Sequence, residues 1–217
     1  RLRKKPGNEK EWALLDIAQT GNIETIRAWD IDGDSFDEIV PNTPGSQLIY
    51  YTLKRDKNNK ALGEFTKTVL IEKHGHGLGF GDINGDGRGD FIVSEGWIEA
   101  PADRNHQAWK FHPDFNLKDA SIPVVVADVN KDGLNDLIAG HGHSYGLYWY
   151  EQKRDEKSVK FIKHPIDAYH SQFHTMEWED IDNDGQMELV TGKRYRAHNG
   201  KDPGGNESPG LYYFKWN

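Results

Sequence analysis

Histidine, tyrosine and arginine residues gather in glycine-rich parts of the chain, and their side chains are those that proton-transfer chemistry uses. The candidates for catalysis are His143, Tyr145, Arg194, Tyr195 and His198, and the candidates for substrate binding are His76, Trp97, His174 and Lys193. A neutral histidine can remove a proton near neutral pH, a tyrosine can return one, and a cation lowers the pKa of a neighbouring carbon acid. The combination suits proton abstraction next to a carboxylate or a carbonyl group.

The histidines also allow a metal site. Two His-x-His pairs, at 74/76 and 141/143, can each place imidazoles on one side of the chain. Three histidines with an open position form a typical zinc site, although the chain has no H-E-x-x-H motif. Zinc or another divalent cation at the histidine cluster is therefore one alternative, and ordinary structural hydrogen bonding of single histidines is another.

A second set of candidates is an acidic pattern, D-x-[DN]-x-D with a further acid at the ninth position, which occurs four times. Its members are Asp30, Asp32, Asp34 and Glu38; Asp82, Asn84, Asp86 and Asp90; Asp128, Asn130, Asp132 and Asp136; and Asp180, Asp182, Asp184 and Glu188. Oxygen ligands at positions 1, 3, 5 and 9 of a tight turn suit calcium. The alternative is that the carboxylates only cap the turn through backbone N–H groups. The twelfth position is never acidic, which excludes an EF-hand.

The spacing of the acidic pattern predicts the elements that carry all these residues. The first aspartates of the four copies are 52, 46 and 52 residues apart, which is close to the length of one propeller blade. Short apolar segments flank each copy, and aromatic segments such as 47–51, 146–150 and 210–214 follow. We therefore expect an all-β propeller of four-stranded blades, with strands A to D in each blade and the acidic pattern in the A–B turn.

The predicted domain boundaries follow from the same repeat. Residues 1–10 are expected to be a linker or a disordered end, and residues 11–217 the propeller. The blades are expected at about 24–71, 76–115, 121–164 and 172–217. A strand over 11–16 either closes the fourth blade or belongs to a preceding one. We expect the four blades to be a slice of a larger ring.

Strand direction predicts two chemically different faces. If the A–B turns lie on one face, the B–C and D–A connections lie on the other. Nine of the ten histidines fall in or near these connections, and only His106 lies elsewhere. The histidine cluster is therefore predicted beside the central funnel, on the face opposite the acidic turns.

Composition limits the classes of function. The formal charge of -8 does not favour nucleic-acid binding, no apolar run is long enough for a membrane span, and the absence of cysteine excludes thiolate catalysis. Fifteen of the 35 acidic residues lie in the four turns, which leaves 20 acids against 27 bases elsewhere. The rest of the surface either presents a positive face to an acidic glycan or has simply mixed charge.

The four acidic copies resemble FG-GAP/VCBS repeats, which build the propellers of integrin α-chains and many secreted bacterial proteins. The resemblance covers residues from about 24 to 217. Three segments, Gly75–Asp82, Gly140–Trp149 and Gly192–Gly200, are similar to the propellers of aldos-2-ulose dehydratase and of rhamnose-glucuronate and ulvan polysaccharide lyases.

This second resemblance implies a seven-bladed ring, a bound divalent cation and sugar β-elimination. It implies His143 and Tyr145 as base and acid, and Arg194 as the residue that neutralises a carboxylate or ketone. It does not fix these roles by position.

Two functional hypotheses result. The first is a calcium-stabilised lyase or dehydratase that is secreted, periplasmic or extracellular and acts on a uronate-containing glycan or a keto-sugar. The second is a non-catalytic calcium-binding FG-GAP module that binds glycans or proteins. The expected partners are an acidic carbohydrate and either the remaining propeller blades or a second subunit.

Overall fold

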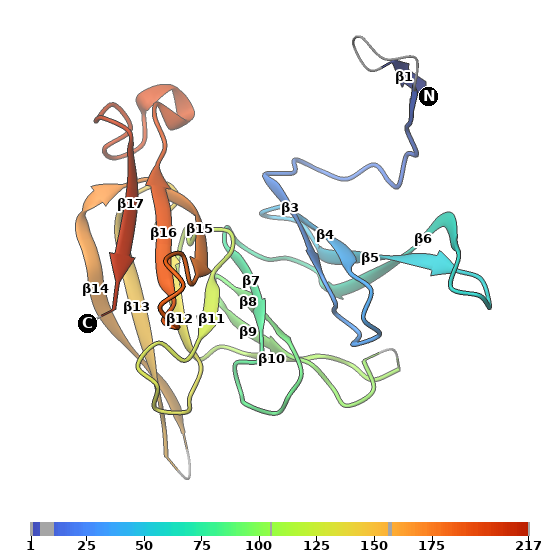
Figure 1. Ribbon diagram of the computed structural model, residues 1–217, viewed down its shortest axis with the longest axis horizontal. Helices are drawn as coiled ribbons and strands as arrows, with labels where there is room; N and C mark the ends of the chain where they lie inside the picture. Colours follow the sequence, from blue (N-terminus) through green and yellow to red (C-terminus); the bar gives the residue numbers. More distant parts are fainter. Residues whose placement is uncertain (1, 5–10, 105, 156–157, 217) are drawn as a thin grey trace.

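The chain folds into four small antiparallel sheets arranged as propeller blades (Figure 1). A computed structural model describes residues 2–4, 11–104, 106–155 and 158–216. Within these ranges the helical structure is a single 3-10 turn, η1 (Ala197–Gly200). No helix in the described part of the chain is long and apolar enough to cross a membrane.

Each sheet takes its strands in chain order. The first contains β3 (Thr25–Trp29), β4 (Glu38–Asn42), β5 (Leu48–Arg55) and β6 (Ala61–Ile71); the second β7 (Leu78–Gly81), β8 (Asp90–Val93), β9 (Gly96–Glu99) and β10 (Lys110–His112); the third β11 (Val125–Ala127), β12 (Asp136–Gly140), β13 (Tyr145–Arg154) and β14 (Val159–Ser171); the fourth β15 (Phe173–Glu179), β16 (Glu188–Lys193) and β17 (Gly210–Lys215). The predicted all-β propeller with acidic A–B turns is confirmed.

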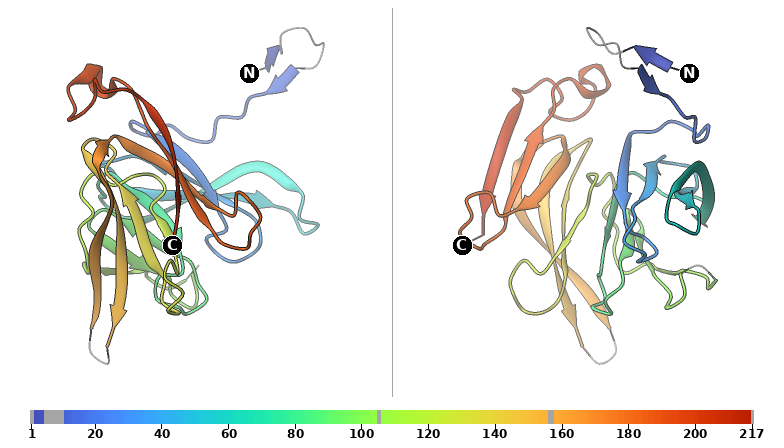
Figure 2. Two further views of the ribbon diagram at one scale, coloured as in Figure 1. Left: turned by 60° about the vertical axis from the view of Figure 1, so that its left-hand side comes forward. Right: turned by 45° about the vertical axis from the view of Figure 1, so that its right-hand side comes forward.

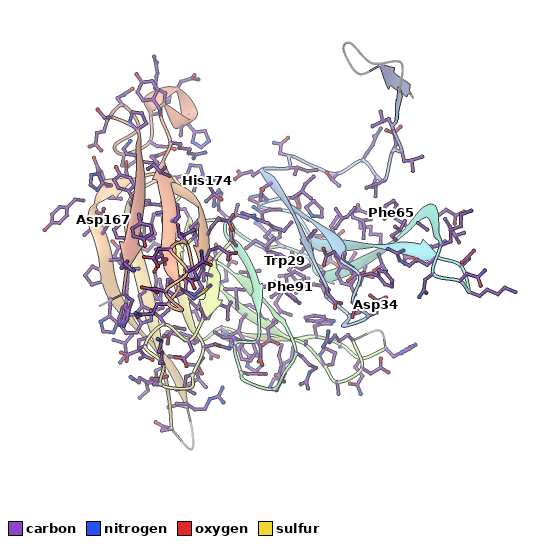
Figure 3. The ribbon with its side chains drawn as sticks, viewed as in Figure 1. Trp29, Asp34, Phe65, Phe91, Asp167 and His174 are labelled. Carbon is purple, nitrogen blue, oxygen red and sulfur yellow. The ribbon has the colours of Figure 1, made fainter. Side chains whose placement is uncertain are left out.

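Apolar side chains fill the spaces between neighbouring sheets. Leu48 and Phe91 belong to a buried cluster between the first and second sheets, where Trp29 packs with its ring centroid 6.2 Å from that of Phe91 (Figure 3). Further clusters join the second sheet to the third and the third to the fourth. Both faces of the two middle sheets are therefore buried, which explains why β8 and β12 are continuous apolar runs.

The innermost strands approach closely at Gly79. This residue forms a parallel bridge with Val124, and a Cβ atom at position 79 would collide with the Val124 carbonyl oxygen. A side chain is therefore excluded where the second and third sheets meet at the centre.

The N-terminal segment departs from the predicted strand over 11–16. The structure has β2 (Glu11–Ala13), which pairs with β1 (Leu2–Lys4) and not with the fourth sheet. Figure 2 shows this hairpin apart from the four sheets in both views. The linker predicted over 1–10 falls on β1 and otherwise on residues 1 and 5–10, which lie outside the described residues.

Another difference concerns the last strand of the third sheet. The sequence predicts that this blade ends near residue 164, but β14 continues to Ser171. His164 and His170 therefore lie within a strand, and the side chain of His164 pairs with Glu151 on β13. Pairing with β13, which continues until Ser171 lies opposite Tyr145, accounts for this extension.

Candidate functional site

Four residues, one from each sheet unit, meet near the centre of the molecule. Glu24 immediately precedes β3, His76 lies before β7, His143 lies between β12 and β13, and His174 is the second residue of β15. One ligand atom from each of the four lies within 4.8 Å of all the others. Figure 3 shows His174 on the side of the fourth sheet that faces β3. We call these four residues the central cluster.

The side chains of the central cluster lie within hydrogen-bond or ion-pair distance of one another. His76 Nε2 lies 3.0 Å from His143 Nε2 and 2.6 Å from Glu24 Oε2. His174 Nε2 lies 3.6 Å from the same carboxylate oxygen. The ring of His76 is nearly perpendicular to those of His143 and His174, with interplanar angles of 84° and 81°. The three Nε2 atoms therefore converge from different directions.

Two rings of the central cluster also form hydrogen bonds on their far side, through Nδ1. His76 Nδ1 lies 2.7 Å from the Ala120 carbonyl oxygen, which can only accept. His143 Nδ1 lies 3.0 Å from Asp202 Oδ2, and hydrogen bonds from His143 and His198 lower the pKa of Asp202 although burial opposes them. Nδ1 of His76 therefore carries a proton, and Nε2 of the same ring faces Glu24, whose carboxylate also only accepts. Nδ1 of His143 faces both an acceptor, Asp202, and a donor, Arg194.

Burial disfavours the protonated, positively charged form of His174 and His143. Desolvation lowers the pKa of His174 to about 4, with contributions from Arg194 and His76. Desolvation is also the main reason why the pKa of His143 is lowered. Neutral imidazoles beside one carboxylate are the donor set that suits zinc and similar divalent ions.

Arg194 places a positive charge next to the central cluster. Its NH2 group donates to the Gly142 carbonyl oxygen at 3.0 Å, and its Nε donates to Gln172 Oε1 at 3.3 Å. The same NH2 group lies 3.0 Å from His143 Nδ1 and 3.9 Å from Asp202. Arg194 is thus held by two neutral acceptors and lies within ion-pair distance of Asp202.

The long β16–β17 connection, residues 194–209, completes the site from above (Figure 1). Its Asp202 contacts His143 and also His198, whose Nδ1 lies 3.0 Å from both carboxylate oxygens. His198 stacks on His143 with ring centroids 4.8 Å apart. Asp202 thus accepts a hydrogen bond from Nδ1 of this exposed ring.

Two further contacts hold this connection in place. Lys193 is 3% exposed, and its Nζ donates to the carbonyl oxygens of Gly204 at 2.8 Å and Glu207 at 3.4 Å. Tyr145 donates its hydroxyl proton to Glu207 Oε1 at 2.6 Å, and this bond raises the tyrosine pKa. Lys193 therefore supports the loop, while Tyr145 stays protonated near neutral pH.

The structure brings together some of the predicted residues but not all. His76, His143, His174, Arg194 and His198 lie in one connected group. Four candidates lie outside it, and two of these, Tyr145 and Lys193, contact the β16–β17 connection. Trp97 is buried in β9, stacks on His112 and donates to Asp114 at 2.8 Å, and Tyr195 is exposed.

Sequence reasoning missed three acidic members, Glu24, Asp202 and Glu207. A signal for Glu24 exists in the repeat register. Glu24, His76 and His174 each lie six residues before the first aspartate of an acidic turn, and Ile122 has this place in the third repeat. His143, from a different connection, supplies the missing fourth side chain. Asp202 and Glu207 lie in a non-repeated loop, where no such register exists.

The acidic A–B turns have the same geometry four times. The first aspartate accepts backbone N–H groups from the turn, for example Asp30 from Gly33 at 2.7 Å and from Ser35 at 2.9 Å. The ninth-position acids Glu38, Asp90, Asp136 and Glu188 are buried and accept an N–H from the start of their own turn. The capping role considered from the sequence is therefore present.

These turns also fit a calcium ion. Carboxylate oxygens of Asp30, Asp32 and Glu38 lie within 4.8 Å of one another, and so do those of Asp180, Asp182 and Glu188 in the fourth turn. Burial and neighbouring carboxylates raise the pKa of Glu38 to about 7, and burial does the same for Asp90. Capping hydrogen bonds leave this excess of buried negative charge uncompensated, and a divalent cation would balance it.

Comparison with known families supports the repeat assignment. Residues 105–191 match the family model described as the FG-GAP-like repeat. The match includes the third and fourth acidic turns and covers less than half of the chain. Together with the four-sheet arrangement it supports an FG-GAP β-propeller. No curated protein matches the chain.

Proposed function

We propose that this protein is a metal-dependent carbohydrate lyase or dehydratase that works by β-elimination, with its centre at the central cluster. One observation carries the proposal. His76 and His143 face each other through Nε2 atoms 3.0 Å apart while both of their Nδ1 atoms face acceptors. A zinc-type ion held between the three Nε2 atoms and the Glu24 carboxylate would make all four groups ligands, and the proton on Nε2 of His76 would be released on binding.

The donor distances support one ion shared by the four residues. Two ligand atoms that each lie about 2.0–2.2 Å from a tetrahedral ion are ~3.3 Å apart. The separations of 2.6, 3.0 and 3.6 Å between Nε2 and carboxylate atoms lie around this value. The carbonyl of Ala120 and the carboxylate of Asp202 then act as the outer partners that orient the ligand rings.

The residues beside the central cluster can perform an elimination. When bound, the ion supplies positive charge that stabilises an anion formed next to a carboxylate or ketone. Arg194 binds the substrate's acidic group, and His198, oriented by Asp202, removes the proton from the adjacent carbon. The released electron pair forms a C=C bond, the C–O bond at the next carbon breaks, and Tyr145 protonates the leaving oxygen.

This assignment changes the role that the resemblance implies for His143. Both of its ring nitrogens face other groups, Nε2 towards His76 and Nδ1 towards Asp202. We therefore propose His143 as a metal ligand and His198 as the base. The acidic-sugar substrate class rests on the resemblance, on Arg194 and on the excess of basic residues outside the acidic turns.

Metal binding is tested first, because its readout does not depend on activity. Chelator-treated protein is titrated with Zn²⁺ in a calorimeter. We expect one high-affinity site in the wild type and its loss in the double variant His76→Ala/His174→Ala. His106→Ala is the matched control, since His106 pairs with Asp103 at the surface. Unchanged zinc binding in the double variant would remove the central cluster from the proposal.

Elimination is then tested by the ultraviolet absorbance of an unsaturated product. The zinc-loaded protein is incubated with uronate glycans and keto-sugars, and His198→Asn is expected to lower turnover about 100-fold or more. If zinc binds but no substrate in either class yields product, the alternative becomes a non-catalytic glycan- or protein-binding module. The similar acidic turns support calcium stabilisation under both proposals.

A further inference from the structure

The fourth acidic turn differs from the others in one cation that the chain itself supplies. Lys215, on β17, places Nζ 2.7 Å from Asp182 Oδ2 and 2.8 Å from Asp184 Oδ2. The same nitrogen lies 3.6 Å from Glu188 Oε1. Three of the four carboxylates that would hold calcium therefore surround an ammonium group.

The position of Lys215 follows from strand register. Lys215 lies directly opposite Glu188, the ninth-position acid, in the β16–β17 pair. When the registers of the other sheets are continued by one residue, the equivalent places hold Thr52, Glu99 and Glu151. Only the fourth sheet has a base here.

The charge of each turn is related to the residue that lies opposite its ninth-position acid. The second and third turns have asparagine, not aspartate, at position 3, and each has a glutamate opposite position 9. Glu151 does reach its turn, because it accepts a hydrogen bond from Asn130 at 3.1 Å. The acidic pattern supplies four acids in the first turn and three in the second, while the third has three together with Glu151; in these three sheets no base lies opposite position 9.

Among the described residues, basic side chains at the second and third turns contact position 5, and Lys153 also pairs with Glu151. Arg88 pairs with Asp86, and Lys153 lies 3.3 Å from Asp132, both at position 5 of their turns. Neither contact reaches a buried ninth-position acid. In the fourth turn Glu188 is fully buried, and its Oε1 has no hydrogen bond, so the nearby ammonium is its source of charge balance.

We propose that Lys215 is the internal cation of the fourth turn and that this turn does not bind Ca²⁺. A calcium ion would need oxygen ligands at about 2.3–2.6 Å in the region that the ammonium already fills. It would also have to displace a like charge from three carboxylates. Calcium binding, as proposed above, then concerns only the first three turns. The inference about the fourth turn depends on the proposed function only in that the other turns bind calcium.

The test counts Ca²⁺ ions bound per chain by equilibrium dialysis. Removing a ligand by Asp182→Asn is expected to leave the wild-type count unchanged. Lys215→Gln is expected to raise the count by one, and adding Asp182→Asn to it should remove the extra ion. Lys54→Gln is the matched control, because Lys54 pairs with Glu64 away from the turns.

A second measurement shows whether Lys215→Gln still folds. Without calcium the variant is expected to melt at a lower temperature than the wild type, since three carboxylates lose their cation. Added Ca²⁺ should raise the melting temperature of Lys215→Gln by more than it raises that of the wild type. A wild-type count that falls with Asp182→Asn, or an unchanged count in folded Lys215→Gln, would overturn the inference. If the wild type bound no calcium, the calcium proposal for the other turns would be refuted. The inference about Lys215 would still be tested by whether Lys215→Gln gains one ion.

Discussion

At the residue scale, Asp202 connects the two halves of the site. Its carboxylate holds Nδ1 of His143, a proposed ligand, and Nδ1 of His198, the proposed base. The same carboxylate lies 3.9 Å from the Arg194 guanidinium, so three side chains contact one acid. Its position determines which nitrogen of each ring faces the substrate side.

Asp202→Asn tests this positioning role. The amide oxygen can still accept one hydrogen bond, but the negative charge that raises ligand basicity is lost. We expect zinc to bind 10- to 100-fold more weakly, the range typical for such outer partners. Zinc titration measures the change, with Asp103→Asn at the surface pair with His106 as the control. A loss of folding without a loss of affinity in the folded fraction would make Asp202 merely structural.

Tyr145→Phe tests the proposed acid. Because the hydroxyl proton is donated to Glu207 and not to the central cluster, the variant should keep wild-type zinc affinity. Turnover should fall about 100-fold, since the leaving oxygen loses its proton donor. Tyr169→Phe, on an exposed position of β14, is the control. Wild-type turnover in Tyr145→Phe would exclude this residue from the reaction.

At the element scale, the inner strands determine how closely the site residues approach. Gly79 brings β7 against Val124, which lies just before β11. This contact places the β6–β7 connection, with His76, beside the Ala120 carbonyl that fixes its tautomer. The geometry of the histidines therefore depends on a residue that has no side chain.

Gly79→Ala should destabilise the fold. The added methyl group collides with the Val124 carbonyl, and the strands must separate. We expect the free energy of unfolding to fall by about 1–3 kcal/mol, as for other overpacked sites. Denaturant unfolding measures this, and Gly21→Ala, whose new Cβ would lie 3.6 Å from its nearest neighbour, should change it little. An equal effect at both positions would show that close packing is not the cause.

The elements themselves were largely predictable because their signal repeats. Four acidic turns at near-constant spacing, each followed by an apolar run such as 90–93, define where the strands must lie. The ends of strands were less predictable, as β14 shows, because pairing with the long β13 extends it through residues with weak apolar character. Glu24 has the same position in its repeat as His76 and His174, but a single glutamate at that position does not by itself indicate a site.

Residues that one loop supplies could not be predicted in the same way. Asp202 reaches His143 across 59 residues of sequence through the β16–β17 connection. Its path depends on left-handed backbone at Arg196, His198 and Asn199, and it is held by the buried Lys193. No periodic pattern encodes such a path, so only the fold reveals it.

At the scale of the whole molecule, the central cluster is a cross-link. Each of the four sheet units contributes one ligand, while direct contacts between sheets are mainly those of chain neighbours. Arg27 adds one more central link, from β3 to the Ile122 carbonyl at 2.7 Å. Four protein ligands would fill the tetrahedral shell of a zinc ion, so the proposed ion would act on a substrate through its charge and not by binding it directly.

Metal removal should therefore lower the stability of the entire propeller. An ion present at 100 times its dissociation constant stabilises the folded state by about 2.7 kcal/mol. For a domain of this size, that corresponds to about 5–11 °C in melting temperature. The melt is recorded with calcium in constant excess, so that only the zinc contribution varies.

The variant His76→Ala/His174→Ala separates the central ion from every other metal. Its melting temperature should be the same with and without zinc, because two of the four ligands are gone. His106→Ala should keep the full zinc-dependent shift. If zinc raised the melting temperature of the double variant as much as that of the wild type, the ion would be bound elsewhere. The first and fourth sheets would then be joined at the centre only by direct contacts such as that of Arg27 with Thr175.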